Sequence, residues 1–131
     1  MNQIEKAFEL VVPGMSLTEV MKTLRIDDPP VQAPFIADPH RQNYYDFGES
    51  GVKVFFDTRN VVRTVCFFQP FSKIVRGIAV GMKARDAIEV LGKPARRWPV
   101  ADGIDRFVYD QPTFLRIDLD AKSGCISHIF L

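Results

Sequence analysis

The sequence predicts an α+β domain of two similar halves, in which short helices pack on one face of an antiparallel sheet. The chain has 131 residues, of which 47% are hydrophobic and 25% charged, as is typical of one compact domain. Apolar residues at helical spacing occur twice, and each time the pattern changes to that of strands. We therefore expect a single domain, residues 1–131, with one pseudo-repeat in residues 1–70 and another in residues 71–131.

The two predicted helices each follow a Gly-Met pair, Gly14-Met15 in the first half and Gly81-Met82 in the second. Apolar residues then recur at positions i, i+3, i+4 and i+7, which places them on one face of a helix. Each predicted helix is therefore short and has one apolar stripe. The stripes are Leu17, Val20, Met21 and Leu24 in the first helix, and Ala84, Ala87, Ile88 and Leu91 in the second.

The ends of these helices carry different signals. Ser16 and Glu19 have the spacing of a capping box at the start of the first helix, whereas Lys83 offers the second helix no comparable cap. Gly92 and Pro94 end the second helix, because glycine adopts the left-handed conformation and proline cannot continue the helical hydrogen bonds.

Each predicted helix is followed by segments rich in valine, phenylalanine and other strand-forming residues, joined by short turns. Three antiparallel strands are therefore expected in each half. They are residues 43–47, 51–57 and 61–68 in the first half, and 106–109, 113–120 and 125–131 in the second. Residues 71–75 fit either a strand or a helical turn. The alternative architecture is a single mixed sheet with an accidental local match.

The sequence offers no recognisable catalytic motif. It lacks the GxSxG, Walker, GxGxxG and HExxH patterns. Cys66 and Cys125 lie in apolar, strand-like segments, where we expect them to pack in the core. His40, in a proline-rich loop, is expected to be solvated. We assign no catalytic residue, no cofactor and no metal ligand, and we predict that the chain is not an enzyme.

The second half resembles the SmpA/OmlA and beta-lactamase-inhibitor-protein-like group of tandem repeats. The resemblance rests on Gly81-Met82, the apolar helix, the Leu-Gly-Lys-Pro of residues 91–94, Trp98, Tyr109 and the final hairpin, and it extends over most of residues 12–131 as two copies. It implies a binding protein that presents a curved sheet and its loops to another protein. The chain departs from the group in lacking a secretion signal, a lipid-accepting cysteine and paired disulfide cysteines. We therefore expect a cytoplasmic relative, such as an immunity protein that neutralises a toxin.

The charge balance narrows the kinds of partner. A net charge of +1 leaves no excess of basic residues to neutralise a run of phosphates, so we expect neither nucleic acid nor a membrane as partner. Apolar residues on both faces of the first hairpin exceed what one buried sheet face needs, which indicates either a covering layer or a contact surface. We predict a protein-binding module, most specifically an immunity or inhibitor protein that binds a toxin or enzyme.

The predicted contact surface is the open sheet face with its bordering loops. Aromatic and arginine side chains are enriched at interface anchors, which favours one of two neighbouring tyrosines and an Arg-Arg-Trp run expected in a loop. Two alternating aspartates on a late strand would add charge complementarity, or form a solvated face with cross-strand ion pairs. The predicted contact residues are Tyr44, Tyr45, Arg96, Arg97, Trp98, Asp118 and Asp120.

Two alternatives stay open at this point. Trp98 would belong to the core if it folds back over the sheet. The chain would be a small-molecule-binding or enzymatic domain if a pocket between the halves used His40 or the pair Asp118 and Asp120.

Overall fold

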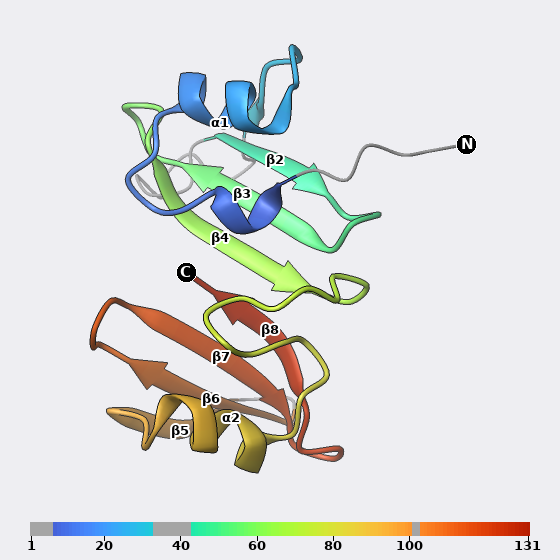
Figure 1. The fold of residues 1–131 in the computed structure, drawn as a ribbon, viewed down its shortest axis with the longest axis vertical. Coiled ribbons are helices and arrows are strands. Elements are labelled where there is room, and N and C mark those ends of the chain that lie inside the picture. Colours follow the sequence, from blue (N-terminus) through green and yellow to red (C-terminus); the bar gives the residue numbers. More distant parts are fainter. Residues whose placement is uncertain (1–6, 33–42, 101–102) are drawn as a thin grey trace. The chain divides into compact units, whose positions relative to one another are not determined.

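The structure, a computed structural model, describes residues 7–32, 43–100 and 103–131 (Figure 1). Within these residues the chain is predominantly β. Eight strands form an antiparallel sheet with the hydrogen-bonded order β1-β2-β3-β4-β8-β7-β6-β5. The strands are β1 (Val31–Gln32), β2 (Asn43–Phe47), β3 (Val52–Phe56), β4 (Val62–Phe68), β5 (Arg96–Val100), β6 (Ile104–Tyr109), β7 (Leu115–Asp120) and β8 (Ile126–Phe130). The helices are the 3-10 turn η1 (Phe8–Leu10), α1 (Leu17–Leu24) and α2 (Ala84–Leu91).

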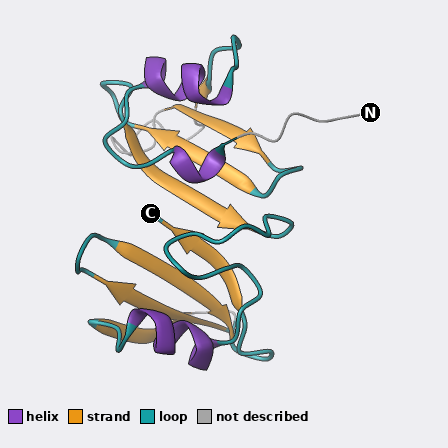
Figure 2. Cartoon of the chain, viewed as in Figure 1, coloured by secondary structure: helices purple, strands orange, loops and turns teal. Residues whose placement is uncertain are grey.

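The predicted fold class was wrong. The sequence indicated an α+β fold of two repeats, each with a helix and a three-stranded meander, whereas strands dominate the described chain (Figure 2). Both α-helices have only eight residues. Because β8 pairs with β4, the strands of both expected repeats belong to one eight-stranded sheet. Two further strands, β1 and β5, come from segments that were expected to be loops.

The described residues divide into two compact units. Unit 1 contains the described residues up to Gly48 together with Val52–Val65, and unit 2 contains Glu49–Gly51 and Cys66–Leu131. Strand β4 therefore begins in unit 1 and ends in unit 2.

Unit 1 has an apolar core between its helices and strands. Val20 and Leu24 of the predicted α1 stripe are buried, whereas Leu17 and Met21 are half-buried. Val54 and Phe56 of β3 are also buried. The capping box of α1 is confirmed, because the Ser16 hydroxyl accepts from the Glu19 N–H while the Glu19 carboxylate accepts from the Ser16 N–H.

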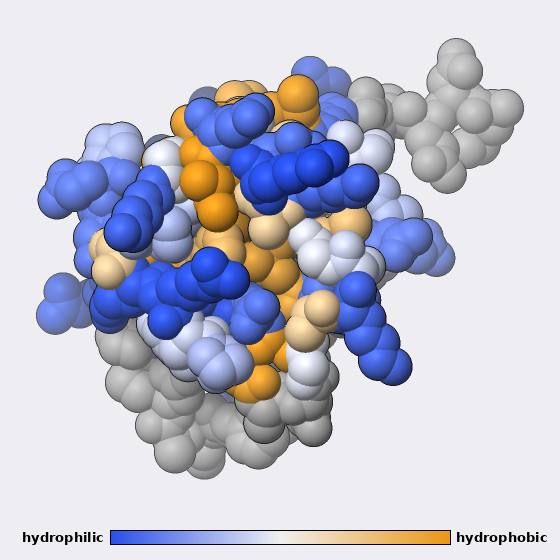
Figure 3. All heavy atoms as spheres, turned by 90° about the horizontal axis from the view of Figure 1, so that it is seen from below, coloured by the Kyte–Doolittle hydropathy of each residue, from blue (hydrophilic) through white to orange (hydrophobic). Residues whose placement is uncertain are grey.

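Unit 2 has its own core, which includes Phe67, Phe107, Ile117 and Ile129. In the space-filling view from below, hydrophobic residues (orange) are visible between hydrophilic ones (blue) (Figure 3). Of the predicted α2 stripe only Ala87 is fully buried. Gly92 follows the helix with a φ of 81°, which favours glycine, but its ψ of −169° lies outside the expected left-handed conformation. Between β7 and β8 the register shifts at Asp118 and Leu119, where a β-bulge places an extra residue in β8. Residues 71–75 form neither a strand nor a helix.

Candidate functional site

One face of the unit 2 sheet carries a row of side chains that lie directly opposite one another on successive strands. Trp98 of β5 pairs with Arg106 of β6, and Arg106 pairs with Asp118 of β7. Asp118 pairs with His128 of β8, and His128 pairs with Phe68 of β4. Residues paired in this way project from the same face. We call these five residues the cross-strand row.

Arg116 and Phe130 lie beside the row on the same face, because each is two residues from a row member on its own strand. The Arg116 guanidinium carbon lies 3.7 Å from the centre of the Phe130 ring, a cation–π contact. The centre of the His128 imidazole ring lies 6.0 Å from that of Phe68 and 5.9 Å from that of Phe130. The face thus combines aromatic surface with guanidinium groups.

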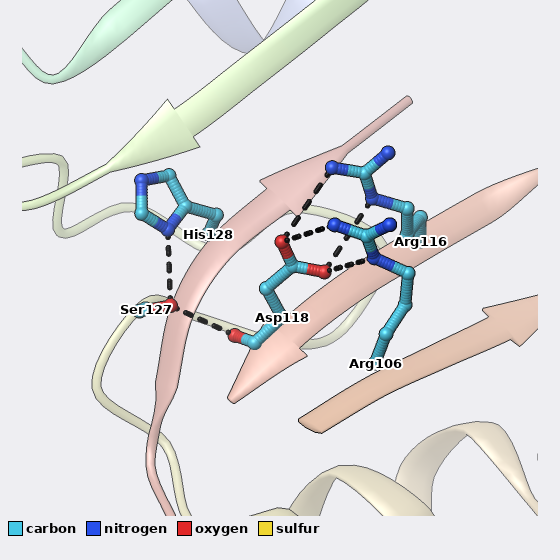
Figure 4. A network of polar contacts seen from close by, with 5 residues as sticks. All are labelled: Arg106, Arg116, Asp118, Ser127 and His128. Carbon is cyan, nitrogen blue, oxygen red and sulfur yellow. Dashed lines mark hydrogen bonds and ion pairs between the residues drawn. The ribbon is translucent and has the colours of Figure 1, made fainter. Parts of the chain in front are cut away.

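A buried carboxylate holds the two arginines in place (Figure 4). Arg106 donates from Nε and Nη2 to the two oxygens of Asp118, at 2.9 and 3.2 Å. Hydrogen bonding to this carboxylate raises the pKa of Arg106 above its ordinary value. The Arg116 Nε lies 3.4 Å from the same carboxylate. Asp118 is 5% exposed, so its charge is satisfied by these two side chains rather than by water. Two guanidinium groups on one carboxylate leave one positive charge in excess.

The bulge fixes the tautomer of His128. The Ser127 hydroxyl donates to the backbone carbonyl of Asp118 at 3.1 Å, and His128 Nδ1 lies 3.0 Å from the same hydroxyl oxygen (Figure 4). Because a hydroxyl has a single hydrogen, Ser127 Oγ accepts from His128 Nδ1–H. In the neutral ring, Nε2 therefore keeps an unprotonated lone pair.

Ser127, His128 and Asp118 do not form a catalytic triad, although all three residue types are adjacent. The carboxylate of Asp118 contacts Arg106 and Arg116, and it makes no hydrogen bond with His128. The Ser127 proton is donated to a backbone carbonyl, so the imidazole does not activate the hydroxyl as a nucleophile.

The Arg-Arg-Trp run forms the strand β5 instead of the expected loop, and this separates its side chains. Trp98 is 39% exposed and belongs to the cross-strand row. Arg97 projects from the opposite face, where its guanidinium carbon lies 4.8 Å from the centre of the buried Phe107 ring. Arg96 is on the same face as Trp98 and forms an exposed ion pair with Asp110 at 2.9 Å. Of these three predicted anchors, Trp98 therefore supplies aromatic surface to the face that carries the cross-strand row.

Tyr44 and Tyr45 are adjacent in β2, in unit 1, and therefore face opposite sides of the strand. Tyr45 is buried, and its hydroxyl donates to the Asp28 carbonyl at 2.6 Å. Burial raises the pKa of Tyr45, with a smaller contribution from the charge of Asp28. Tyr44 is half-buried and packs against Phe55, with ring centres 5.8 Å apart. Tyr45 is thus a core residue, and Tyr44 is the one of the pair that remains a candidate anchor.

Asp118 and Asp120 are placed differently from each other. Asp118 is buried within the row, whereas Asp120 is exposed and accepts from the Lys122 N–H and the Ser123 hydroxyl in the turn after β7. His40 lies outside the described residues. In the described part of the chain no group of three His, Cys, Asp or Glu side chains is arranged to hold a metal ion.

Sequence reasoning left Arg106, Arg116, His128 and the two phenylalanines out of the predicted contact surface. The alternation of residues 115–120 already placed Arg116 beside Asp118 on one face. The cross-strand neighbours depend on strand register, which requires the β5–β6 pairing and the bulge.

A pocket of about 650 Å³ lies at the end of the cross-strand row within unit 2. Its lining includes Phe68 and His128 of the row, and Asp120, Ser123 and Ser127 beside it. The alternative expectation placed a pocket between the halves 1–70 and 71–131. Phe68, Gln69 and Pro70 of this lining belong to the first of these halves and the other lining residues to the second, and all of them belong to unit 2.

Comparison with protein-family models, with curated proteins and with solved structures finds no match to this chain. The resemblance to the SmpA/OmlA and beta-lactamase-inhibitor-protein-like group therefore stays a prediction. None of the helices in the described ranges is long and apolar enough to cross a membrane.

Proposed function

We propose that the chain is a protein-binding module that contacts its partner through the cross-strand row and its neighbours Arg116 and Phe130. The supporting observation is the combination of tryptophan, phenylalanine and arginine side chains on one sheet face, with the arginines fixed by Asp118. Such side chains dominate many interfaces, because rigid aromatic and guanidinium groups provide a large contact area with little loss of rotamer freedom.

Side-chain docking on this face fits the chain better than addition of a partner strand to β5. β5 is the last strand in the sheet order, and it carries Arg96, Arg97 and Pro99. Charged residues and proline are devices that protect an edge strand from pairing with another chain. The face of the sheet, with its exposed Trp98, is therefore the proposed contact.

The specific form of the proposal is an immunity or inhibitor protein that binds a toxin or an enzyme. Its support is the sequence resemblance described above. The experiment is affinity capture from the native organism with the tagged chain, followed by measurement of the captured protein's activity with and without the chain. Inhibition at stoichiometric amounts is the expected result. A captured protein whose activity the chain leaves unchanged would contradict the inhibitor assignment.

A second candidate function, small-molecule binding, is favoured by the pocket beside His128. Mass spectrometry of the chain purified under native conditions separates the two candidates. A co-purified metabolite, with no protein retained from the lysate, would favour this second function over the first.

A further inference from the structure

The turn between β3 and β4 and the turn between β7 and β8 each begin at an aspartate, but the two aspartates have different side-chain partners. In the turn between β3 and β4, Asp57 accepts from the N–H groups of Arg59 and Val61, at 2.8 and 3.1 Å. In the turn between β7 and β8, Asp120 accepts from the Lys122 N–H at 3.1 Å. Each aspartate also donates its own N–H across its hairpin at 2.9 Å. In both turns the aspartate side chain thus accepts from the N–H two residues further on, although the turn between β7 and β8 is one residue longer.

The two aspartates differ in whether a basic side chain pairs with them. The Nε of Arg63 donates to Asp57 at 2.8 Å. Asp120 forms no ion pair with any side chain in the described residues, and its second oxygen accepts from the Ser123 hydroxyl. Hydrogen bonds identify the residue that stands in place of Arg63. Val62 and Ile126 donate their N–H groups to Met15 and Met82, which are the matching methionines of the two Gly-Met pairs.

Ser127, which follows Ile126, therefore occupies the position that Arg63 occupies after Val62. Its side chain is too short to reach Asp120 and instead bonds to the Asp118 carbonyl. The pocket of about 650 Å³ opens between these groups, and both Ser127 and Asp120 line it.

The pocket has the chemistry of a site for a cation with several N–H groups. Asp120 is the one carboxylate among its lining residues, and the hydroxyls of Ser123 and Ser127 and the lone pair of His128 Nε2 are further acceptors. Phe68 supplies an aromatic ring, on which a guanidinium can stack. A planar guanidinium offers five donors and is more weakly hydrated than an ammonium, so it suits several acceptors around one carboxylate.

We infer that this pocket accepts an arginine side chain of the partner protein, which pairs with Asp120 as Arg63 pairs with Asp57 within the chain. The inference rests on the proposed function in one respect, namely that the guanidinium belongs to a protein partner. The partner surface would then have a basic residue at the end of the row that contains the pocket. Opposite Arg106 and Arg116, in contrast, acidic residues of the partner would be attracted.

The test is an NMR titration of the isotope-labelled full chain with N-acetyl-L-arginine amide, and separately with the citrulline analogue. Citrulline has the same shape but no charge. Saturable shifts at Asp120, Ser123 and the His128 ring are expected with the arginine probe, with about tenfold weaker binding of the citrulline probe. Equal binding of the two probes, or no saturable shift at these residues, would overturn the inference.

Asp120→Asn is the matched variant, because asparagine keeps an oxygen that accepts the Lys122 N–H and loses only the charge. We expect the preference for arginine over citrulline to disappear. Asp110→Asn, which removes an equal charge from an exposed residue outside the pocket lining, should retain it. Backbone spectra of both variants report folding. A preference that survives Asp120→Asn in a folded chain would contradict the role of this carboxylate.

Free L-arginine separates the two sources of a guanidinium. Free L-arginine has an ammonium and a carboxylate where the capped probe, like a protein chain, has amide groups. A pocket for a protein side chain should therefore bind it no more tightly than the capped probe, whereas tighter binding would indicate a metabolite site and overturn the protein source. Failure of the pocket and failure of the proposed function remain distinguishable. The titration needs no partner, and the capture experiment does not depend on Asp120.

Discussion

The Asp118 carboxylate is the residue on which the geometry of the row depends. Its Arg106 and Arg116 partners are each 22% exposed, whereas Asp118 itself is 7% exposed at the side chain, so the cluster lies partly out of water. Without the carboxylate, two guanidinium groups would face one another with no counter-charge, which destabilises a folded chain.

Asp118→Asn should therefore lower the free energy of unfolding by about 2 kcal/mol, measured by urea denaturation. The control is Asp110→Asn, which breaks the exposed pair with Arg96 and should change the same quantity by less than about 1 kcal/mol. Equal effects of the two substitutions would show that the Asp118 cluster is no more than a surface ion pair.

Tyr45 and Tyr44 allow a similar comparison. Tyr45→Phe removes the hydroxyl that donates to the Asp28 carbonyl and should lower the free energy of unfolding by about 1 kcal/mol. Tyr44→Phe should leave it within about 0.5 kcal/mol, because Tyr44 is half-buried and its ring contacts remain. Thermal and urea unfolding of the two variants decide whether Tyr45 is a core residue.

Asp57 should make stability depend on acid pH. Burial acts to raise the pKa of Asp57, but the hydrogen bonds from Val61, Arg59 and Arg63 outweigh it, so the pKa lies below its ordinary value. Its contribution is fully present above the unfolded pKa of about 3.9 and is lost as pH falls through the lower folded pKa. The difference in unfolding free energy between the wild type and Asp57→Asn should therefore shrink between about pH 5 and pH 2. A difference that stays constant over this range would contradict the lowered pKa.

At the scale of elements, the two helices differ mainly in their caps. Ser16→Ala removes the capping box of α1 and should lower the free energy of unfolding by about 1 kcal/mol. The exposed Lys83 begins α2 with extended backbone angles but no side-chain cap, so Lys83→Ser should raise the free energy of unfolding by about 0.5 kcal/mol. Urea denaturation measures both changes, and a loss of stability on Lys83→Ser would contradict the capping argument.

Strands and caps were largely predictable because they depend on local patterns. The ranges expected for β2, β3, β4, β7 and β8 agree with the structure within two residues at either end. The strand β5 was not predictable in this way, since Arg96, Arg97 and Pro99 are unusual in a central strand and are tolerated because β5 lies at the edge of the sheet. The Gly-Met match reports equivalent hydrogen bonds at the two helix starts, and it does not define the fold class.

At the scale of the whole molecule, the candidate site arises from register rather than from composition. Trp98 and Asp118 were selected from the sequence, but Arg106, which joins them, is visible only when β5, β6 and β7 are aligned. Burial of Asp118 and Tyr45 likewise follows from neighbours distant in sequence. A local pattern places a side chain on a face, whereas the residues that cover it come from other strands.

The role of the cross-strand row is tested most directly by the dissociation constants of the captured partner for three forms of the chain. Trp98→Ala should weaken binding roughly thirtyfold, as expected for loss of an aromatic anchor worth about 2 kcal/mol. Arg97→Ala, one residue away on the opposite face of β5, should leave the constant within about threefold of the wild type. If Arg97→Ala weakens binding and Trp98→Ala does not, in variants that stay folded, the partner does not bind through the cross-strand row.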